Sequence, residues 1–140
     1  MKFFMAMIPP TVTHHDKKLC AWTSNGKARA CLHDSERLRD ARAKLHAALA
    51  PFRPAEPMQR PVRLVVKWLF PRGQHADGAW KTTRPDTDNL QKALKDEMTR
   101  LGFWRDDALV ASETCEKFWA ERTGVYVCAY EMEEDSRWTQ

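Results

Sequence analysis

The sequence predicts one α/β (α+β) domain in which two main helices pack on a mixed β-sheet. The chain has 140 residues, enough for one hydrophobic core and few for two. Apolar residues make up 43% of it, which argues against disorder. Segments with strand and helix periodicity follow in the order strands, helix, strand, helix, strands, which is typical of helices layered on a sheet. We therefore expect a single domain over residues 1–140, with a polar tail at 133–140 that frays.

The N-terminal part predicts a strand and then a hairpin. Lys2–Ile8 has strand character, and Pro9-Pro10 ends it because proline cannot donate a hydrogen bond to a neighbouring strand. Asn25-Gly26 is a strong signal for a two-residue hairpin turn, which would place Cys20 opposite Cys31 as a cross-strand apolar pair. The two strands of this hairpin are expected at Lys18–Trp22 and Lys27–Leu32.

A helix is predicted after the hairpin. Asp34-Ser35 supplies an N-cap. Apolar residues follow at helical spacing, namely Leu38, Ala41, Leu45, Ala48 and Leu49. Basic side chains lie off this stripe, and they form either a solvated face, which we favour, or a face that contacts phosphates. They are Arg37, Arg39, Arg42 and Lys44.

The middle of the chain predicts the central strand of the sheet. Val62–Phe70 is rich in β-branched and apolar residues, as is typical of a strand covered on both faces. A proline-rich segment, 51–61, precedes it as a stiff connection, and a polar loop, 71–83, follows it. Pro85 then favours an extended backbone at Arg84.

A second helix and two further strands complete the predicted fold. The helix begins near Asp88 and ends at Gly102. Leu109–Trp119 and Val125–Met132 are predicted to form a closing C-terminal hairpin. Phe103-Trp104 packs in the core or at a dimer interface, or else stacks on DNA; we favour packing because such aromatics are generally buried. The buried stripe of the helix consists of Leu90, Ala93, Leu94, Met98 and Leu101.

Cysteine usage and hydropathy exclude several classes of protein. The four cysteines form no CxxC pair and do not group with histidines at zinc-finger spacing. We therefore expect buried thiols rather than disulfides or zinc ligands. No segment approaches the length of a membrane span, and the N-terminal apolar segment is too short for a signal peptide, so we expect a cytoplasmic protein.

Charge is distributed unevenly along the chain. Residues 1–70 contain 13 Lys/Arg and 5 Asp/Glu, whereas residues 71–140 contain 10 and 14. A basic half beside an acidic half suits a nucleic-acid-binding surface that serves an acidic metal site. Ordinary variation along a chain would give the same numbers, so charge alone does not decide between these interpretations.

Two carboxylates open the stretch where the chemistry is concentrated. Asp86 and Asp88 are one residue apart in an extended segment, so their side chains point to the same face. Two like charges this close repel each other, and a divalent cation removes that penalty. Oxygen ligands suit Mg²⁺ or Mn²⁺ rather than zinc. An acidic pair at the start of a helix also occurs as a simple cap, so the spacing alone does not establish a metal site.

Further charged residues follow on the same helix and after it. Lys92 and Asp96 continue from Asp88 at four-residue spacing. They form either salt bridges or, with the Lys92 ammonium beside the metal, a contact to the scissile phosphate. Asp106-Asp107 follows the helix, and one of these carboxylates returns to the acidic pair only if the next strand runs alongside residues 62–70.

A longer motif spans residues 84–110, in which DNLQKA is followed eight residues later by GFW, one variable residue and DDA. This stretch resembles the RusA family of Holliday junction resolvases. The resemblance implies that Asp86, Asp88 and Asp107 are catalytic metal ligands, that Asp106 is a neighbouring candidate ligand, and that Lys92 is the catalytic lysine. It also implies a homodimer that binds four-way DNA junctions and nicks two strands of like polarity with Mg²⁺ or Mn²⁺, in recombination and repair.

The predicted DNA contacts are basic residues of the N-terminal half and of the motif, namely Arg84, Lys17, Lys18, Lys27 and Arg29. His14-His15 is expected to lie in a polar loop outside the catalytic set. Two alternatives stay open. One is a basic junction-binding dimer without catalysis, in which the acids only cap and salt-bridge the helix. The other is a two-metal phosphoesterase that acts on another nucleic acid.

Overall fold

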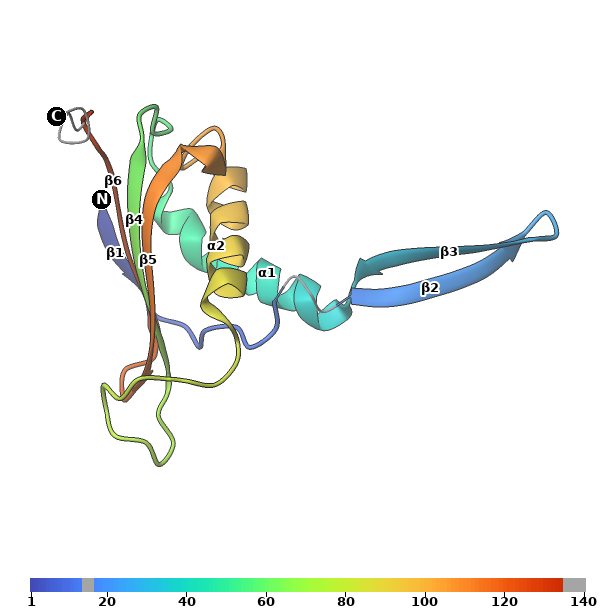
Figure 1. Ribbon diagram of the computed structural model, residues 1–140, viewed down its shortest axis with the longest axis horizontal. Coiled ribbons are helices and arrows are strands. Elements are labelled where there is room, and N and C mark those ends of the chain that lie inside the picture. Colours follow the sequence, from blue (N-terminus) through green and yellow to red (C-terminus); the bar gives the residue numbers. More distant parts are fainter. Residues whose placement is uncertain (14–16, 135–140) are drawn as a thin grey trace, which may run out of the picture.

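A four-stranded mixed sheet forms the body of the protein, with β4 (Val62–Pro71) inside it. The computed structural model describes residues 1–13 and 17–134, Lys17 by its backbone only. The strand order is β1-β6-β4-β5, where β1 is Lys2–Met5, β5 is Val110–Ala120 and β6 is Gly124–Glu131. β4 runs parallel to β5 and antiparallel to β6 (Figure 1). The predicted fold class and the central strand are confirmed.

The predicted closing hairpin is wrong in its pairing. β5 and β6 follow each other directly in the chain, but β4 lies between them and each pairs with β4 instead. The connection at 121–123 therefore passes across the end of β4, where Pro71 pairs with Ala120 and Leu69 with Gly124. A short connection between two strands ordinarily indicates a hairpin, but the periodicity of a strand does not identify its partner.

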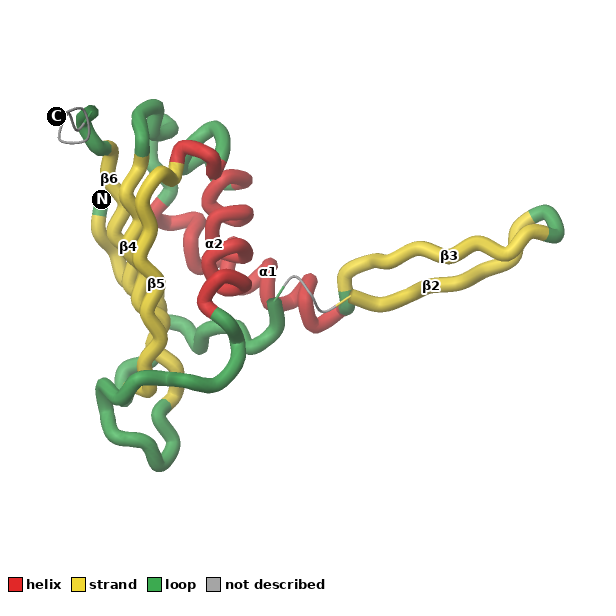
Figure 2. Tube along the Cα trace, viewed as in Figure 1, coloured by secondary structure: helices red, strands yellow, loops and turns green. Residues whose placement is uncertain are grey.

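Two helices cover one face of this sheet (Figure 2). α1 spans Glu36–Leu49 and is followed by a short 3-10 helix, η1 (Ala50–Phe52). α2 spans Thr87–Arg100, and a second 3-10 helix, η2 (Asp107–Leu109), comes after it. Ser35 caps α1 as predicted, since its side chain accepts a hydrogen bond from the backbone N–H of Leu38 at 3.1 Å. α2 supplies the crossover that the parallel pair β4 and β5 requires. Neither helix, nor any other in the described part of the chain, is long and apolar enough to cross a membrane.

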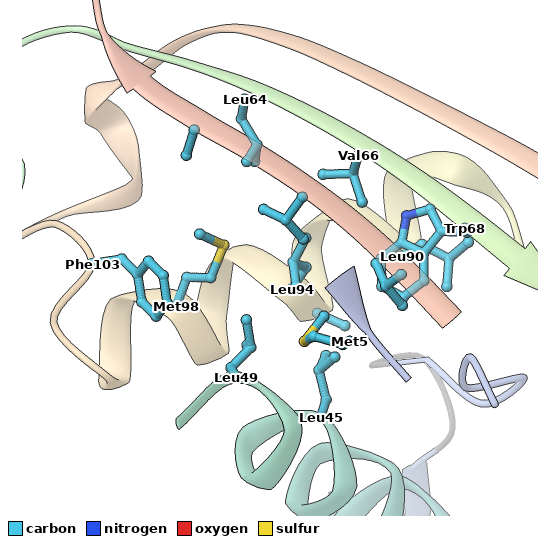
Figure 3. Close-up of a cluster of buried hydrophobic side chains, with 14 of the residues drawn as sticks. Met5, Leu45, Leu49, Leu64, Val66, Trp68, Leu90, Leu94, Met98 and Phe103 are labelled. Carbon is cyan, nitrogen blue, oxygen red and sulfur yellow. The ribbon is translucent and has the colours of Figure 1, made fainter. Parts of the chain in front are cut away.

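The core lies between the helices and the sheet (Figure 3). Alternate residues of β4 are buried and meet the apolar stripes of both helices. Phe103 and Trp104 belong to the same cluster with 0% and 1% exposure, so their predicted packing in the core is confirmed. The fully buried members contributed by β4 and the helices include Leu45, Leu49, Leu64, Val66, Trp68, Leu90, Leu94 and Met98.

The N-terminal hairpin forms as predicted but stands apart from the core. β2 (Lys17–Ser24) and β3 (Lys27–Asp34) form a separate two-stranded sheet that projects from the body (Figure 1). Asn25-Gly26 makes the turn with positive φ at both residues, and Cys20 pairs with Cys31. Both cysteines are exposed, so the prediction of buried thiols is wrong for this pair and holds for Cys128. A cross-strand pair is buried only where another layer covers the sheet, and β2 and β3 form a separate two-stranded sheet.

The different environments of the two regions can be tested with matched leucine truncations. Leu49→Ala removes a side chain with 0% exposure, and the resulting cavity should lower the free energy of unfolding by about 2–5 kcal/mol. Leu32→Ala truncates a hairpin side chain that is 67% exposed and should change that free energy by less than about 0.5 kcal/mol. Urea denaturation measures both, and equal losses would show that the hairpin is packed like the core.

Candidate metal centre

Asp86 and Asp88 lie at the start of α2. Asp86 occupies the N-cap position with an extended backbone, φ −73° and ψ 150°, and its carbonyl accepts a hydrogen bond from the N–H of Leu90 at 3.1 Å. Its carboxylate makes no capping hydrogen bond, and Asp88 lies inside the first turn. The helix was predicted to begin near Asp88, and it begins at Thr87 with Asp86 as its N-cap. The Asp86 carboxylate has no capping role and is available to another ligand, close to the positive end of the helix dipole.

Both carboxylates line one recess of about 570 Å³. The recess also receives the side chain of Arg37 from α1, one of the four basic residues for which a solvated face was favoured. Arg84 contributes a second guanidinium group, and such groups bind both carboxylates and phosphates. The recess thus combines two carboxylates with two guanidinium groups. Its remaining wall consists of Thr11, Val12, Thr13, Pro85 and Asn89.

Lys92 connects α2 to the segment that follows it. Its ammonium nitrogen lies 2.9 Å from Asp96 Oδ1 and 3.6 Å from Asp107 Oδ2. The hydrogen bond that Lys92 donates to Asp96, with a smaller contribution from Asp107, raises the pKa of Lys92 above its usual value, so this side chain is cationic at neutral pH. The salt bridge between Lys92 and Asp96, one of the two interpretations of their four-residue spacing, is present. Asp107 therefore contacts α2 at Lys92, one helical turn after Asp88.

Asp106 has a structural role of its own. Its Oδ1 accepts a hydrogen bond from the N–H of Ala108 at 2.8 Å and so caps η2. This contact orients the short helix from which Asp107 reaches Lys92. Of the two adjacent acids, Asp107 is consequently the one left with a side chain directed at α2.

The described residues contain no group of three or more His, Cys, Asp or Glu side chains close enough to hold a metal ion. Asp86 and Asp88 share the recess, whereas Asp107 contacts Lys92 and is not part of the recess wall. The chemistry of the donors nevertheless fits a hard cation, because all three offer carboxylate oxygens. A three-carboxylate site would require Asp107 to move closer to the pair than it lies here. The His14-His15 pair lies outside the described residues.

Two lysines that the sequence did not single out hold the backbone ahead of Asp86. Lys81 is only 7% exposed, and its ammonium donates to Thr83 Oγ1 at 2.5 Å and to the carbonyl of Arg84 at 2.7 Å. Lys117 of β5 donates to the carbonyls of Thr83 and Pro85 at 2.8 and 2.7 Å. Together they bind the backbone oxygens of three consecutive residues, which fixes the entry to α2.

The surroundings of Lys81 are built by residues that are distant from it in the sequence. Its ammonium lies over the rings of Trp119 and Phe70, at 4.2 and 5.0 Å from the ring centroids. Burial, and then the neighbouring charge of Lys117, lowers the pKa of Lys81. The loop at 71–83 reaches this position by pairing with the edge of β5, where the N–H of Lys81 donates to the carbonyl of Lys117 at 3.0 Å. A loop lysine carries no sequence signal for such a contact.

One further acid faces α2 from the sheet. Glu113 of β5 lies 3.0 Å from the ammonium of Lys95 and accepts a 3.5 Å hydrogen bond from Gln91 Nε2. Gln91 is 3% exposed and its Oε1 has no hydrogen-bond partner. These contacts attach α2 to β5 through Lys95 and Gln91. Asp86 and Asp88 line the recess, and Glu113 is not part of its wall.

Comparison with known proteins assigns the chain to a family. The family model described as Endodeoxyribonuclease RusA matches residues 9–129, so the protein belongs to the RusA family. The resemblance predicted from residues 84–110 is confirmed. The chain is also similar to the crossover junction endodeoxyribonuclease rusA of Lactococcus phage r1t, with 38% identity over 69 residues. That match covers 47% of this chain and 53% of the phage protein, about half of the relative's length.

The holding role of Lys117 can be tested without any assay of activity. Lys117→Met removes two hydrogen bonds from a charged donor, which should accelerate amide hydrogen exchange of residues 83–88 roughly tenfold while stability elsewhere is retained. Lys67→Met is the control, because Lys67 pairs with Glu116 and does not contact this segment. Hydrogen exchange followed by mass spectrometry reads both variants. Equal protection of residues 83–88 in wild type and Lys117→Met would show that the lysine does not hold them.

Proposed function

We propose that the protein is a divalent-metal-dependent endodeoxyribonuclease that resolves four-way DNA junctions in recombination and repair. The observation that carries this proposal is the pair Asp86 and Asp88, which shares a recess with two arginines and includes a carboxylate that makes no capping hydrogen bond. Membership of the RusA family supports cleavage of DNA. The name of the phage relative, a crossover junction endodeoxyribonuclease, supports the junction as substrate.

In this proposal the metal ligands are Asp86, Asp88 and Asp107, and the ion is Mg²⁺ or Mn²⁺. Carboxylate oxygens are the donors that these hard cations prefer. Asp106 was a candidate ligand, but it is better assigned to capping η2, because its carboxylate already accepts a backbone hydrogen bond. A divalent cation in this position supplies Lewis-acid activation of the phosphodiester and of water.

Lys92 and the arginines act on the phosphate in this scheme. Lys92 is cationic and half exposed, so its ammonium can exchange Asp107 for a phosphate oxygen and offset the charge that develops during cleavage. Arg84 and Arg37 line the recess and would hold the strand on either side of the scissile bond.

A homodimer follows from the symmetry of the proposed substrate. A four-way junction is resolved by two equivalent nicks, and Asp86 and Asp88 line the same recess of each chain. Two copies related by a two-fold axis would present two equivalent sites. The reason to expect a dimer is therefore the two-fold symmetry of the proposed junction substrate.

Substitution of the acids should separate cleavage from binding. We expect wild-type protein to cut a synthetic four-way junction in Mg²⁺ and not in EDTA. Asp86→Asn, Asp88→Asn and Asp107→Asn should each lower the cleavage rate by at least about a hundredfold, because each removes a charged ligand. Junction binding in EDTA should be retained or tightened, since negative charge near phosphate is lost. Asp40→Asn, the same change at an exposed residue of α1, is the control.

These outcomes distinguish the alternatives. Cleavage that persists in EDTA would rule out the metal mechanism. Absence of cleavage by the wild type, together with tight junction binding, would support a binding protein without catalysis. Faster cleavage of another nucleic acid would assign the site to a different phosphoesterase. Equal loss of binding and cleavage in the asparagine variants would make the acids structural.

The role of Lys92 is tested by a separate pair of variants. Lys92→Ala should slow single-turnover cleavage on the order of a hundredfold at saturating DNA, because a cation beside the reacting phosphate is lost. Lys92→Arg should retain part of the rate. Lys95→Ala, three residues further along α2 at a lysine that pairs with Glu113, should remain close to wild type. An unchanged rate in Lys92→Ala would remove this residue from the catalytic set.

A further inference from the structure

The β2–β3 hairpin has two faces of different chemistry. Cross-strand partners share a face, and successive residues along a strand alternate between faces. On one face the pairs are Leu19 with Leu32, Ala21 with Ala30 and Thr23 with Ala28. On the opposite face the pairs are Lys18 with His33, Cys20 with Cys31, Trp22 with Arg29 and Ser24 with Lys27. The second of these is called the cationic face.

Among the described residues, no acid on the cationic face balances its positive charge. Residues 17–33 contain no Asp or Glu at all. Among the residues that the structure describes, Lys18, Lys27 and Arg29 have no anionic partner, and all three are exposed. Trp22 lies between them with 47% exposure. Unpaired cations around an aromatic ring are the surface expected for a polyanion.

The shape of the hairpin also indicates a missing partner. β2 and β3 pair only with each other, and the ribbon extends away from the body (Figure 1). A two-stranded ribbon alone in water is marginally stable, so contact with a partner would order it. The major groove of double-stranded DNA is wide enough to admit such a ribbon.

We propose that the cationic face of the β2–β3 hairpin binds the phosphate backbone of double-stranded DNA away from the acidic recess. Lys18, Lys27 and Arg29 provide the phosphate contacts. The inference rests on the proposed function for the identity of the nucleic acid, which would be a duplex arm of the junction. It adds a second DNA-binding surface, whose contribution would be affinity and orientation rather than chemistry.

The first experiment measures DNA binding without cleavage. The variant Lys18→Gln/Lys27→Gln/Arg29→Gln removes three charges and keeps the hairpin turn. In EDTA, its affinity for a four-way junction and for a linear duplex should be weaker by roughly tenfold to a hundredfold, and the slope of log affinity against log salt should fall by about 2–3. The control Lys2→Gln/Arg53→Gln/Arg60→Gln removes the same charge from exposed residues of the body and should keep the wild-type slope.

A second experiment tests proximity with native thiols. Cys20 and Cys31 are exposed on the cationic face, whereas Cys128 is buried and burial raises the pKa of the Cys115 thiol to about 11, which makes it poorly reactive. A photoactivatable label on Cys20 and Cys31 should therefore cross-link to bound DNA. The same label on Ala30→Cys, in a Cys20→Ser/Cys31→Ser background, lies on the apolar face and should cross-link at least several times less.

Either of two results would overturn the inference. One is an unchanged salt slope in the triple variant. The other is loss of binding accompanied by a lower molar mass in light scattering, which would make the hairpin an interface with a second copy of the chain. Failure of the proposed function is seen separately: a wild type that never cleaves, but whose salt slope still falls in the triple variant, would refute the nuclease and support the DNA-binding hairpin.

Discussion

The position of the candidate site depends on the burial of one face of α2 against β4. Leu90, Leu94 and Met98 are excluded from water together with the inward side chains of β4, and each such side chain contributes about 1.5–3 kcal/mol. This contact fixes the helix along the sheet. The acids Asp86 and Asp88 precede it, and the chain that leaves its far end folds back so that Asp107 reaches Lys92. Residues about twenty positions apart in sequence are thereby held along a single helix.

The acidic pair is oriented by the backbone before it rather than by capping. Lys81 and Lys117 together bind the carbonyls of residues 83–85, which leaves the Asp86 carboxylate without a structural hydrogen bond. Positive charge thus stabilises this segment, and two arginines line the same recess as the acids. The arrangement suits a site whose negative charge is to be neutralised by a ligand, because the protein does not neutralise it fully by direct pairing.

Local signals in the sequence predicted much of this structure. Asn25-Gly26 determined the hairpin and its register, and the apolar stripe of α2 predicted the packed helix. The predictions that failed concern contacts between residues distant in the sequence. The partner of a strand is not encoded in its periodicity, so β5 and β6 were paired with each other although β4 separates them. The exposure of Cys20 and the aromatic rings packed against Lys81 likewise depend on which elements lie next to these residues in the fold. The motif predicted which acids matter, but not how far Asp107 lies from the pair.

Whether Asp86, Asp88 and Asp107 act as one cation site is the central question, and direct binding of Mn²⁺ answers it. Electron paramagnetic resonance of free Mn²⁺ during a titration of the DNA-free protein, in which no substrate can be cleaved, gives the affinity. We predict that Asp88→Asn and Asp107→Asn each weaken Mn²⁺ binding by roughly tenfold or more, since each removes a ligand of the same ion. Wild-type Mn²⁺ affinity in Asp107→Asn, alongside a loss in Asp88→Asn, would contradict the three-carboxylate centre.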